Sequence, residues 1–271
     1  NGSEAWVLRQ SGRNRIIEDG TIVIEDGELV AVRPAEDDDH ELPAETVIDG
    51  TGTVAIPGLV DAHRHTDFCL VGGLFADLDP FDALAEAIAL YHTDAESLGR
   101  SFFEASWRLA CLRQLTHGVT TVNAMDGYPA IGARAVGESG LRAVIGLDFS
   151  DLVMPASVSD QVAEIRAFID EYHGSYDGRV QASLAPDGTG ACSRESWEAT
   201  AVLREEYPEL LLHTHAFNVP YSAVVARGTH GNDRLGTLDD LGLLDDRTVI
   251  AHCTHADADD TRPAAPILPL S

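Results

Sequence analysis

Hydrophobic and polar positions follow different patterns in the two parts of the chain. Up to residue 57 the apolar positions fall in short alternating or β-branched runs, joined in pairs by Asp26-Gly27 and Asp49-Gly50, which are dipeptides typical of hairpin turns. These runs are Thr21–Glu25, Glu28–Val32, Thr46–Ile48 and Thr53–Ile56. The pattern therefore predicts a small β-rich segment with two hairpins, which ends at Pro57-Gly58.

From residue 58 onward, six short apolar runs alternate with longer amphipathic stretches. The runs are Leu59–Ala62, Val119–Val122, Leu141–Gly146, Val180–Ala185, Leu210–Thr214 and Thr248–Ala251. Nearly continuous apolar strands are expected in a parallel sheet whose faces are covered by helices. Their regular order predicts an α/β fold in which residues 58–271 form an incomplete TIM-type (β/α)8 barrel of about six β/α units. An open doubly wound sheet also fits the pattern, although no glycine-rich phosphate loop follows the first strand.

Capping signals place two helices between the first and second of these strands. Asp79 before Pro80 is the expected start of the first helix. Thr93 and Glu96 form a capping box, which predicts the start of a second helix that Gly118 ends.

Histidines end three of the six predicted strands. His63 and His65 follow the first strand two residues apart, so they project from the same face. His213 and His215 close the fifth strand, and His252 closes the sixth. The carboxyl ends of barrel strands meet at one edge, where barrel enzymes keep their active sites. The set therefore predicts a metal centre, although any one of these histidines taken alone is more often a packed core or surface residue.

Imidazole ligands indicate which metals and which chemistry such a centre supports. Neutral imidazole suits Zn²⁺ and Fe²⁺ better than Mg²⁺ or Ca²⁺. Either ion lowers the pKa of a bound water towards about 7, which provides hydroxide for attack on an electron-poor carbon. We therefore expect metal-assisted hydrolysis with Zn²⁺ or Fe²⁺ as the cofactor.

Three segments resemble motifs of the amidohydrolase superfamily, and in particular those of its cytosine deaminase, guanine deaminase and triazine chlorohydrolase branch. They are Pro57-Gly58-Leu59-Val60-Asp61-x-His63-x-His65, Gly118-Val119-Thr120-Thr121 and Ala251-His252-Cys253-Thr254-His255. The resemblance extends over nearly the whole chain to about His255. It implies that residues 1–57 are the first half of a β-sandwich domain and that residues 58–271 belong to the barrel.

The resemblance also implies roles for single residues. His63 and His65 match the first two metal ligands of the branch, and His215 matches the ligand on strand five. His252 matches the strand-six histidine, which ligates the metal or hydrogen-bonds its water, so it is the candidate catalytic residue as well as a ligand. His213 lies one layer deeper and is expected to pack rather than to ligate.

The sequence departs from the branch at several points. Asn218 replaces the proton-shuttling Glu of the H-x-x-E motif, and Asp187 occupies the strand-four position that often carries a substrate-facing His; we assign both to substrate binding. No strand-eight Asp follows His255, so we expect a barrel truncated after strand six. Because the chain has no Lys, a carbamylated lysine cannot bridge two metals, which favours a single ion. A bridging carboxylate from Asp187 is the less favoured alternative.

Charge is the most unusual bulk property of the chain. The sequence has 45 Asp and Glu residues, and all 18 basic residues are Arg, for a formal net charge of −27. Such a surface repels itself in dilute buffer and is screened in molar salt, which is typical of cytoplasmic proteins from salt-accumulating halophiles; an acidic mesophilic protein is the alternative. The negative field opposes nucleic acid and anionic membranes, and no apolar run is long enough to span a bilayer. We expect a small-molecule substrate as partner, and a homo-oligomer is compatible with the sequence.

Together these features favour a metal-dependent aminohydrolase (a deaminase) that acts on an amino-substituted heterocycle such as a purine, pyrimidine or triazine. Two alternatives stay open. Asn218 and the missing strand-eight Asp are compatible with a catalytically inactive remnant that only binds metal. Chlorohydrolase or amidase chemistry at the same metal also fits, because these residues do not specify the leaving group.

Overall fold

The computed structural model describes residues 6–9, 15–39, 42–154, 156–217 and 235–256. The chain divides into two compact units, residues 1–59 and residues 60–271, and each is described by itself. Within the described part of the chain, no helix combines the length and the apolar character needed to cross a membrane.

The first unit is built from short strands. They are β1 (Trp6–Arg9), β2 (Arg15–Ile17), β3 (Gly20–Glu25), β4 (Glu28–Pro34) and β5 (Val54–Ala55). Strands β3 and β4 pair antiparallel, and the predicted turn at Asp26-Gly27 is confirmed, since both residues have positive φ (50° and 82°) as a tight hairpin turn requires. Strand β1 pairs antiparallel with β2 and parallel with β5.

The second predicted hairpin is wrong. Residues 46–48 form no strand, and the side chains of Val47 and Ile48 are exposed. Asp49 instead accepts hydrogen bonds from the main-chain amide of Thr51, at 2.9 Å, and from its hydroxyl. This local turn satisfies the backbone without a partner strand. The β-branched run therefore has the composition of a strand but pairs with no strand among the residues that the structure describes.

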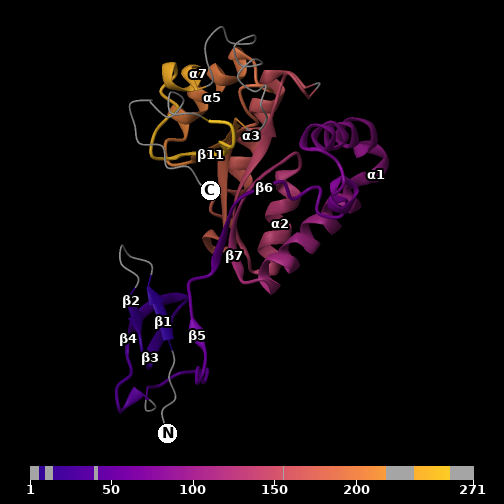
Figure 1. Cartoon of the computed structure of the whole chain (residues 1–271). Coiled ribbons are helices and arrows are strands. Elements are labelled where there is room, and N and C mark those ends of the chain that lie inside the picture. The colour runs from indigo at the N-terminus through magenta and orange to yellow at the C-terminus, as the bar shows by residue number, and fades with distance from the viewer. Residues whose placement is uncertain (1–5, 10–14, 40–41, 155, 218–234, 257–271) are drawn as a thin grey trace. The chain divides into compact units, whose positions relative to one another are not determined.

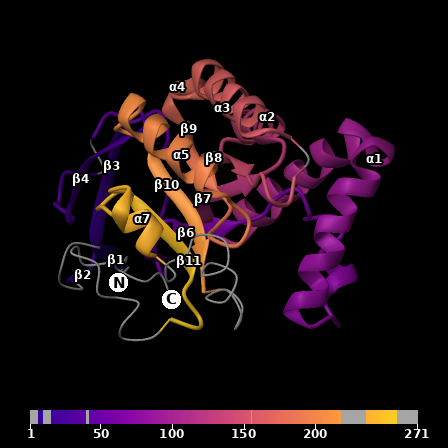
Figure 2. The same ribbon diagram turned by 90° about the horizontal axis from the view of Figure 1, so that it is seen from above.

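The second unit contains the α/β fold that the sequence predicted. The six strands of this unit, drawn in Figure 1 and all labelled in Figure 2, form one parallel sheet in the order β11-β10-β9-β8-β7-β6. They are β6 (Leu59–Arg64), β7 (Val119–Asp126), β8 (Arg142–Phe149), β9 (Val180–Pro186), β10 (Leu211–Ala216) and β11 (Thr248–His252). Each of the six predicted apolar runs is thus a strand.

The sheet curves strongly enough to bring its distant strands together. Strands β6 and β10 are four positions apart in the sheet, which would separate them by about 19 Å if the sheet were flat. Yet Nδ1 of His63 on β6 lies 2.9 Å from Nε2 of His213 on β10. The six strands therefore form a nearly closed barrel of the TIM type.

Helices alternate with the strands and lie on the outer side of the barrel (Figure 2). They are α1 (Pro80–Thr116), α2 (Pro129–Ser139), α3 (Val158–Tyr172), α4 (Ser175–Gly178), α5 (Arg194–Glu206) and α7 (Gly236–Asp240), with a short 3-10 helix η2 (Gly72–Phe75) before α1. The core between helices and strands is closely packed: Trp107 of α1 and Trp197 of α5 are almost completely buried. A Cβ atom on Gly132 of α2 would lie only 2.4 Å from the Trp107 ring, so the two helices approach closely because this residue has no side chain.

The division of α1 differs from the prediction. The expected second start at Thr93 is wrong, because the helical run continues to Gly99, where φ is 71° and ψ is 167°. Only glycine adopts this conformation readily, so the break in the helix falls there. The predicted end is confirmed: α1 stops at Thr116, and Gly118 follows with φ of 79°.

Candidate metal centre

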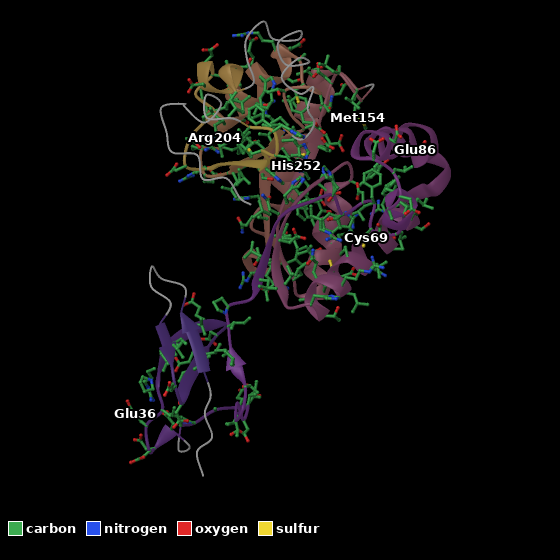
Figure 3. The ribbon with its side chains drawn as sticks, viewed as in Figure 1. Glu36, Cys69, Glu86, Met154, Arg204 and His252 are labelled. Carbon is green, nitrogen blue, oxygen red and sulfur yellow. The ribbon has the colours of Figure 1, made fainter. Side chains whose placement is uncertain are left out.

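Five histidines converge at the carboxyl ends of three strands. Strand β6 carries His63 and positions His65 just beyond its end, β10 carries His213 and His215, and β11 ends at His252, which is labelled in Figure 3. Nε2 of His215 lies 3.1 Å from Nε2 of His65 and 3.3 Å from Nε2 of His63. The rings of His215 and His252 stack with centroids 5.2 Å apart. The structure therefore brings together all four histidines that the sequence assigned to a metal.

The spacing of the ring nitrogens fits a single small cation. Ligand atoms of His63, His215 and His252 all lie within 4.8 Å of one another. A Zn–N bond of about 2.0–2.1 Å in tetrahedral geometry places ligand nitrogens about 3.3–3.4 Å apart. The distances from His215 to His63 and His65 are close to this value, so the side chains need little rearrangement to hold an ion.

The protonation states of the cluster also favour a cation. Burial and then the neighbouring His215 lower the pKa of His65 to about 4, and the same two causes lower the pKa of His63 and of His252. These rings are therefore neutral at physiological pH and offer nitrogen lone pairs, the form in which imidazole binds a metal.

His215 is oriented by the residue at the end of β9. Its Nδ1 lies 2.6 Å from the main-chain oxygen of Asp187 and 3.6 Å from the carboxylate oxygen Oδ1 of the same residue. Burial opposes the charged ring, but the hydrogen bond to Asp187 and its carboxylate outweigh burial and raise the pKa of His215. A proton held on Nδ1 leaves the lone pair of Nε2 free on the side of His63 and His65. Hydrogen-bond partners usually fix the rings of metal-binding histidines in this way.

His213 lies behind the cluster and supports it. Its side chain is completely buried, and its Nε2 lies 2.9 Å from Nδ1 of His63. This contact directs the other nitrogen of His63, Nε2, towards His215. His213 thus orients a candidate ligand, a contact more specific than the packing that the sequence suggested.

Two aspartate side chains lie beside the histidines. Asp187, one of the two predicted substrate-binding residues, has a side chain that is 33% exposed. The half-buried Asp148 at the end of β8 lies against it: burial and then the charge of Asp187 raise the pKa of Asp148 well above its usual value. Asp187 itself is ionised, because its contacts with His215 lower its pKa in spite of burial. Asn218, the other predicted substrate-binding residue, lies outside the described residues.

The sequence interpretation missed Asp148 and the carboxylates of Asp67 and Asp126. Asp67 and Asp126 are completely buried next to the turn that follows His65. A signal was present in the sequence, since Asp126 and Asp148 are acidic residues at or next to the carboxyl ends of strands β7 and β8. Asp61, by contrast, contacts Gln114 of α1 at 2.6 Å and not the histidines, in keeping with a structural role.

The backbone turns sharply just after the histidines. Phe217, His252 and Cys253 all have positive φ, at 56°, 75° and 52°. Such values are uncommon for residues other than glycine, and they are often found at functional sites where surrounding contacts hold them. Here the amide of Cys253 donates to the carbonyl of Ala216 at 3.0 Å, which ties the end of β11 to the end of β10.

Comparison with known proteins agrees with this geometry. Residues 54–269 match the model of the amidohydrolase family. Because the match includes most of the chain and all five histidines, the chain belongs to the amidohydrolase family.

Two proteins with similar sequences are deaminases. A 5'-deoxyadenosine deaminase of Methanothermobacter thermautotrophicus is 34% identical over 234 residues, which are 86% of this chain and 53% of that protein. A 5-methylthioadenosine/S-adenosylhomocysteine deaminase of Symbiobacterium thermophilum is 27% identical over 257 residues, 94% of this chain and 57% of that protein. The chain thus spans about half the length of the curated relatives it matches.

Solved structures agree on the fold. An atrazine chlorohydrolase of Arthrobacter aurescens in complex with zinc and atraton superimposes with a TM-score of 0.82 at 24% identity, over 92% of this chain and 59% of that one. The guanine deaminase of E. coli has a TM-score of 0.75 at 20% identity, over 95% of this chain and 62% of that one. At these identities the likeness shows a common fold and no more.

Proposed function

We propose that the chain carries the metal centre of a metal-dependent aminohydrolase that deaminates an amino-substituted purine, with adenine nucleosides as the substrate class. The single observation that carries the proposal is the cluster of His63, His215 and His252, whose ligand atoms lie within 4.8 Å of one another, with Nε2 of His65 3.1 Å from Nε2 of His215. The names of the relatives, all deaminases of adenine nucleosides or related compounds, support the substrate class.

The side chains have distinct parts in this proposal. The four histidines would hold one Zn²⁺ or Fe²⁺, and the bound ion would supply Lewis-acid activation of water. Asp187 keeps the proton of His215 on Nδ1 and offers a partly exposed carboxylate, which accepts a hydrogen bond from an amino group or ring N–H of a substrate. The sequence likeness favours deamination over the dehalogenation that is named for the structural relative.

The proposal is tested by metal content and turnover measured on the same preparations. The protein is loaded with Zn²⁺ or Fe²⁺ in concentrated KCl, and bound metal is measured by elemental analysis after gel filtration. Deamination of 5'-deoxyadenosine and adenosine is followed by ammonia release. We expect about one ion per chain in the parent protein, and loss of both ion and turnover in His63→Ala and His215→Ala.

His117→Ala is the matched control, since His117 is exposed at the end of α1 and lies outside the cluster. It is expected to keep the metal and the turnover of the parent protein. Unchanged metal content in His63→Ala and His215→Ala would show that the ligands are assigned wrongly. Full metal occupancy without ammonia release from either nucleoside would contradict the proposed reaction and favour a chain that only binds metal.

A further inference from the structure

The turn that follows His65 is held by a carboxylate from the neighbouring strand. Oδ1 of Asp126, at the end of β7, accepts hydrogen bonds from the main-chain amides of Thr66 at 2.6 Å and Asp67 at 2.9 Å. Both Thr66 and Asp67 are almost completely buried, as is Asp126 itself. The amide next to His65 is therefore fixed from a strand 60 residues further along the chain.

Asp67 in turn accepts hydrogen bonds from the residue after Asp126 and from a side chain of α1. Its Oδ2 accepts from the main-chain amide of Gly127, at 3.1 Å, and its Oδ1 accepts from the indole Nε1 of Trp107 at 2.8 Å. Each aspartate thus binds backbone next to the other, and Asp67 adds an anchor on the buried face of α1. The hydroxyl of Ser106 closes the arrangement by donating to the carbonyl of Thr66 at 3.2 Å.

His65 is held by the same strand end on its other side. Its ring is in hydrogen-bonding contact with the main chain of Met125, the residue before Asp126, while its Nε2 faces His215 at 3.1 Å. The dipeptide Met125-Asp126 therefore contacts both the ring of His65 and the backbone that follows it. Side chains that orient a ligand in this way typically change metal affinity by about 10- to 100-fold when they are removed.

We propose that Asp126 and Asp67 are positioning residues of the metal centre. They fix the turn after His65, so that Nε2 of His65 points at the ion. The inference rests on the proposed function, because it presupposes that the histidines bind a metal. Neither aspartate contacts the ion in this proposal. Asp126 acts through the amides of Thr66 and Asp67, and Asp67 acts through Gly127 and Trp107.

Two variants of Asp126 separate the effect of its hydrogen bonds from the effect of its charge. Asp126→Asn keeps an oxygen at the Oδ1 position and can still accept from both amides, whereas Asp126→Ala leaves two buried amides without an acceptor. The matched control is Asp245→Ala. Asp245 also accepts from a nearby main-chain amide, that of Arg247 at 2.9 Å, but it precedes β11 and so lies at the opposite ends of the strands from the histidines.

The measurements are Zn²⁺ affinity, by competition with a chromophoric chelator, and the visible absorption spectrum of the Co²⁺-loaded protein, which reports ligand number and geometry. We expect Asp126→Ala to bind Zn²⁺ at least about 10-fold more weakly and to alter the Co²⁺ spectrum. Asp126→Asn should stay within about threefold of the parent protein with an unchanged spectrum. Asp245→Ala should change neither quantity.

Every other outcome would contradict the proposed function or the positioning role of the aspartates. A parent protein that binds no metal would overturn the proposed function and this inference together. A metal-binding parent whose Asp126→Ala variant has the same affinity and spectrum would overturn the positioning role alone, as would an equal loss in Asp245→Ala. If Asp126→Ala does not fold, Trp107→Phe decides: it removes the indole donor to Asp67 and leaves a smaller aromatic ring at this position, and an unchanged Co²⁺ spectrum would overturn the inference.

Discussion

At the scale of single residues, Asp126 gives the barrel unit a stability that depends on pH. Burial, and then the nearby charge of Asp67, raise the pKa of Asp126 well above its usual value. A carboxyl whose pKa is raised on folding stabilises the fold below its unfolded pKa, about 3.9, and this contribution is lost as pH rises through the folded value. Asp126 therefore costs the folded state more at neutral pH than in acid.

Asp126→Asn removes that dependence, because the amide is neutral at every pH. We expect the free energy of unfolding of Asp126→Asn, relative to the parent protein, to increase from about pH 5 to about pH 8. Asp245→Asn should stay parallel to the parent protein over this range, since the hydrogen bond from Arg204 lowers the pKa of Asp245 in spite of burial, and the contribution of such a carboxyl is lost only as pH falls below about 4. Urea titrations in concentrated KCl at several pH values measure the free energy of unfolding of the two variants and of the parent protein. If this free energy depends on pH in the same way in all three proteins, the prediction is contradicted.

The same residues show what the sequence could predict about the site. His63 and His65 are two apart at a strand end, so their common direction follows from local geometry. The contact between Asp126 and the turn at Thr66 joins residues 60 apart, and it exists only because β6 and β7 are neighbours in the sheet. Which nitrogen of each ring faces the other histidines depends on tertiary partners such as Asp187, and no sequence spacing contains that information.

At the scale of elements, the contact between α1 and α2 depends on Gly132. A methyl group at this position would lie 2.4 Å from the Trp107 ring, which is 1% exposed, so the ring or a helix has to shift. We expect Gly132→Ala to lower the free energy of unfolding by about 1–3 kcal/mol, in spite of the better helix propensity of alanine. Gly72→Ala is the control, because nothing lies within 4 Å of an added Cβ there.

Chemical denaturation of the two variants and the parent protein measures the effect. Gly72→Ala should stay close to the parent value. An unchanged stability in Gly132→Ala would show that the helices separate without strain. Since Trp107 also donates to Asp67, Gly132→Ala should in addition weaken Zn²⁺ binding, whereas Gly72→Ala should not.

The elements that the sequence predicted correctly are those whose pattern is local. All six apolar strands of the barrel and the turn at Asp26-Gly27 follow from runs of a few residues. The predictions were wrong where the pairing of strands, or the backbone conformation of a single residue, determined the structure. Residues 46–48 have the composition of a strand but no partner in the described part of the chain, and the break in α1 follows the positive φ of Gly99 rather than the capping box at Thr93.

At the scale of the whole molecule, the balance of charge determines how stability responds to salt. The chain has 45 carboxylates against 18 arginines, so repulsion among like charges dominates at neutral pH. Favourable surface pairs such as Arg166–Glu206, at 2.7 Å, are also screened by salt, but each contributes only about 0–1 kcal/mol. The net effect of screening is therefore stabilising.

We expect the free energy of unfolding to rise steadily as KCl increases from about 0.1 M to above 1 M, over which the Debye length falls from about 10 Å to about 3 Å. Urea titrations at fixed pH and increasing KCl measure this, with sucrose at matched water activity as the uncharged control, because excluded osmolytes stabilise proteins without screening charge. Lowering the pH towards 4 should shrink the KCl effect, since protonated carboxyls no longer repel one another. Stability that falls with KCl, or that rises equally with sucrose, would show that charge repulsion does not limit the fold and would remove the main argument for adaptation to molar salt.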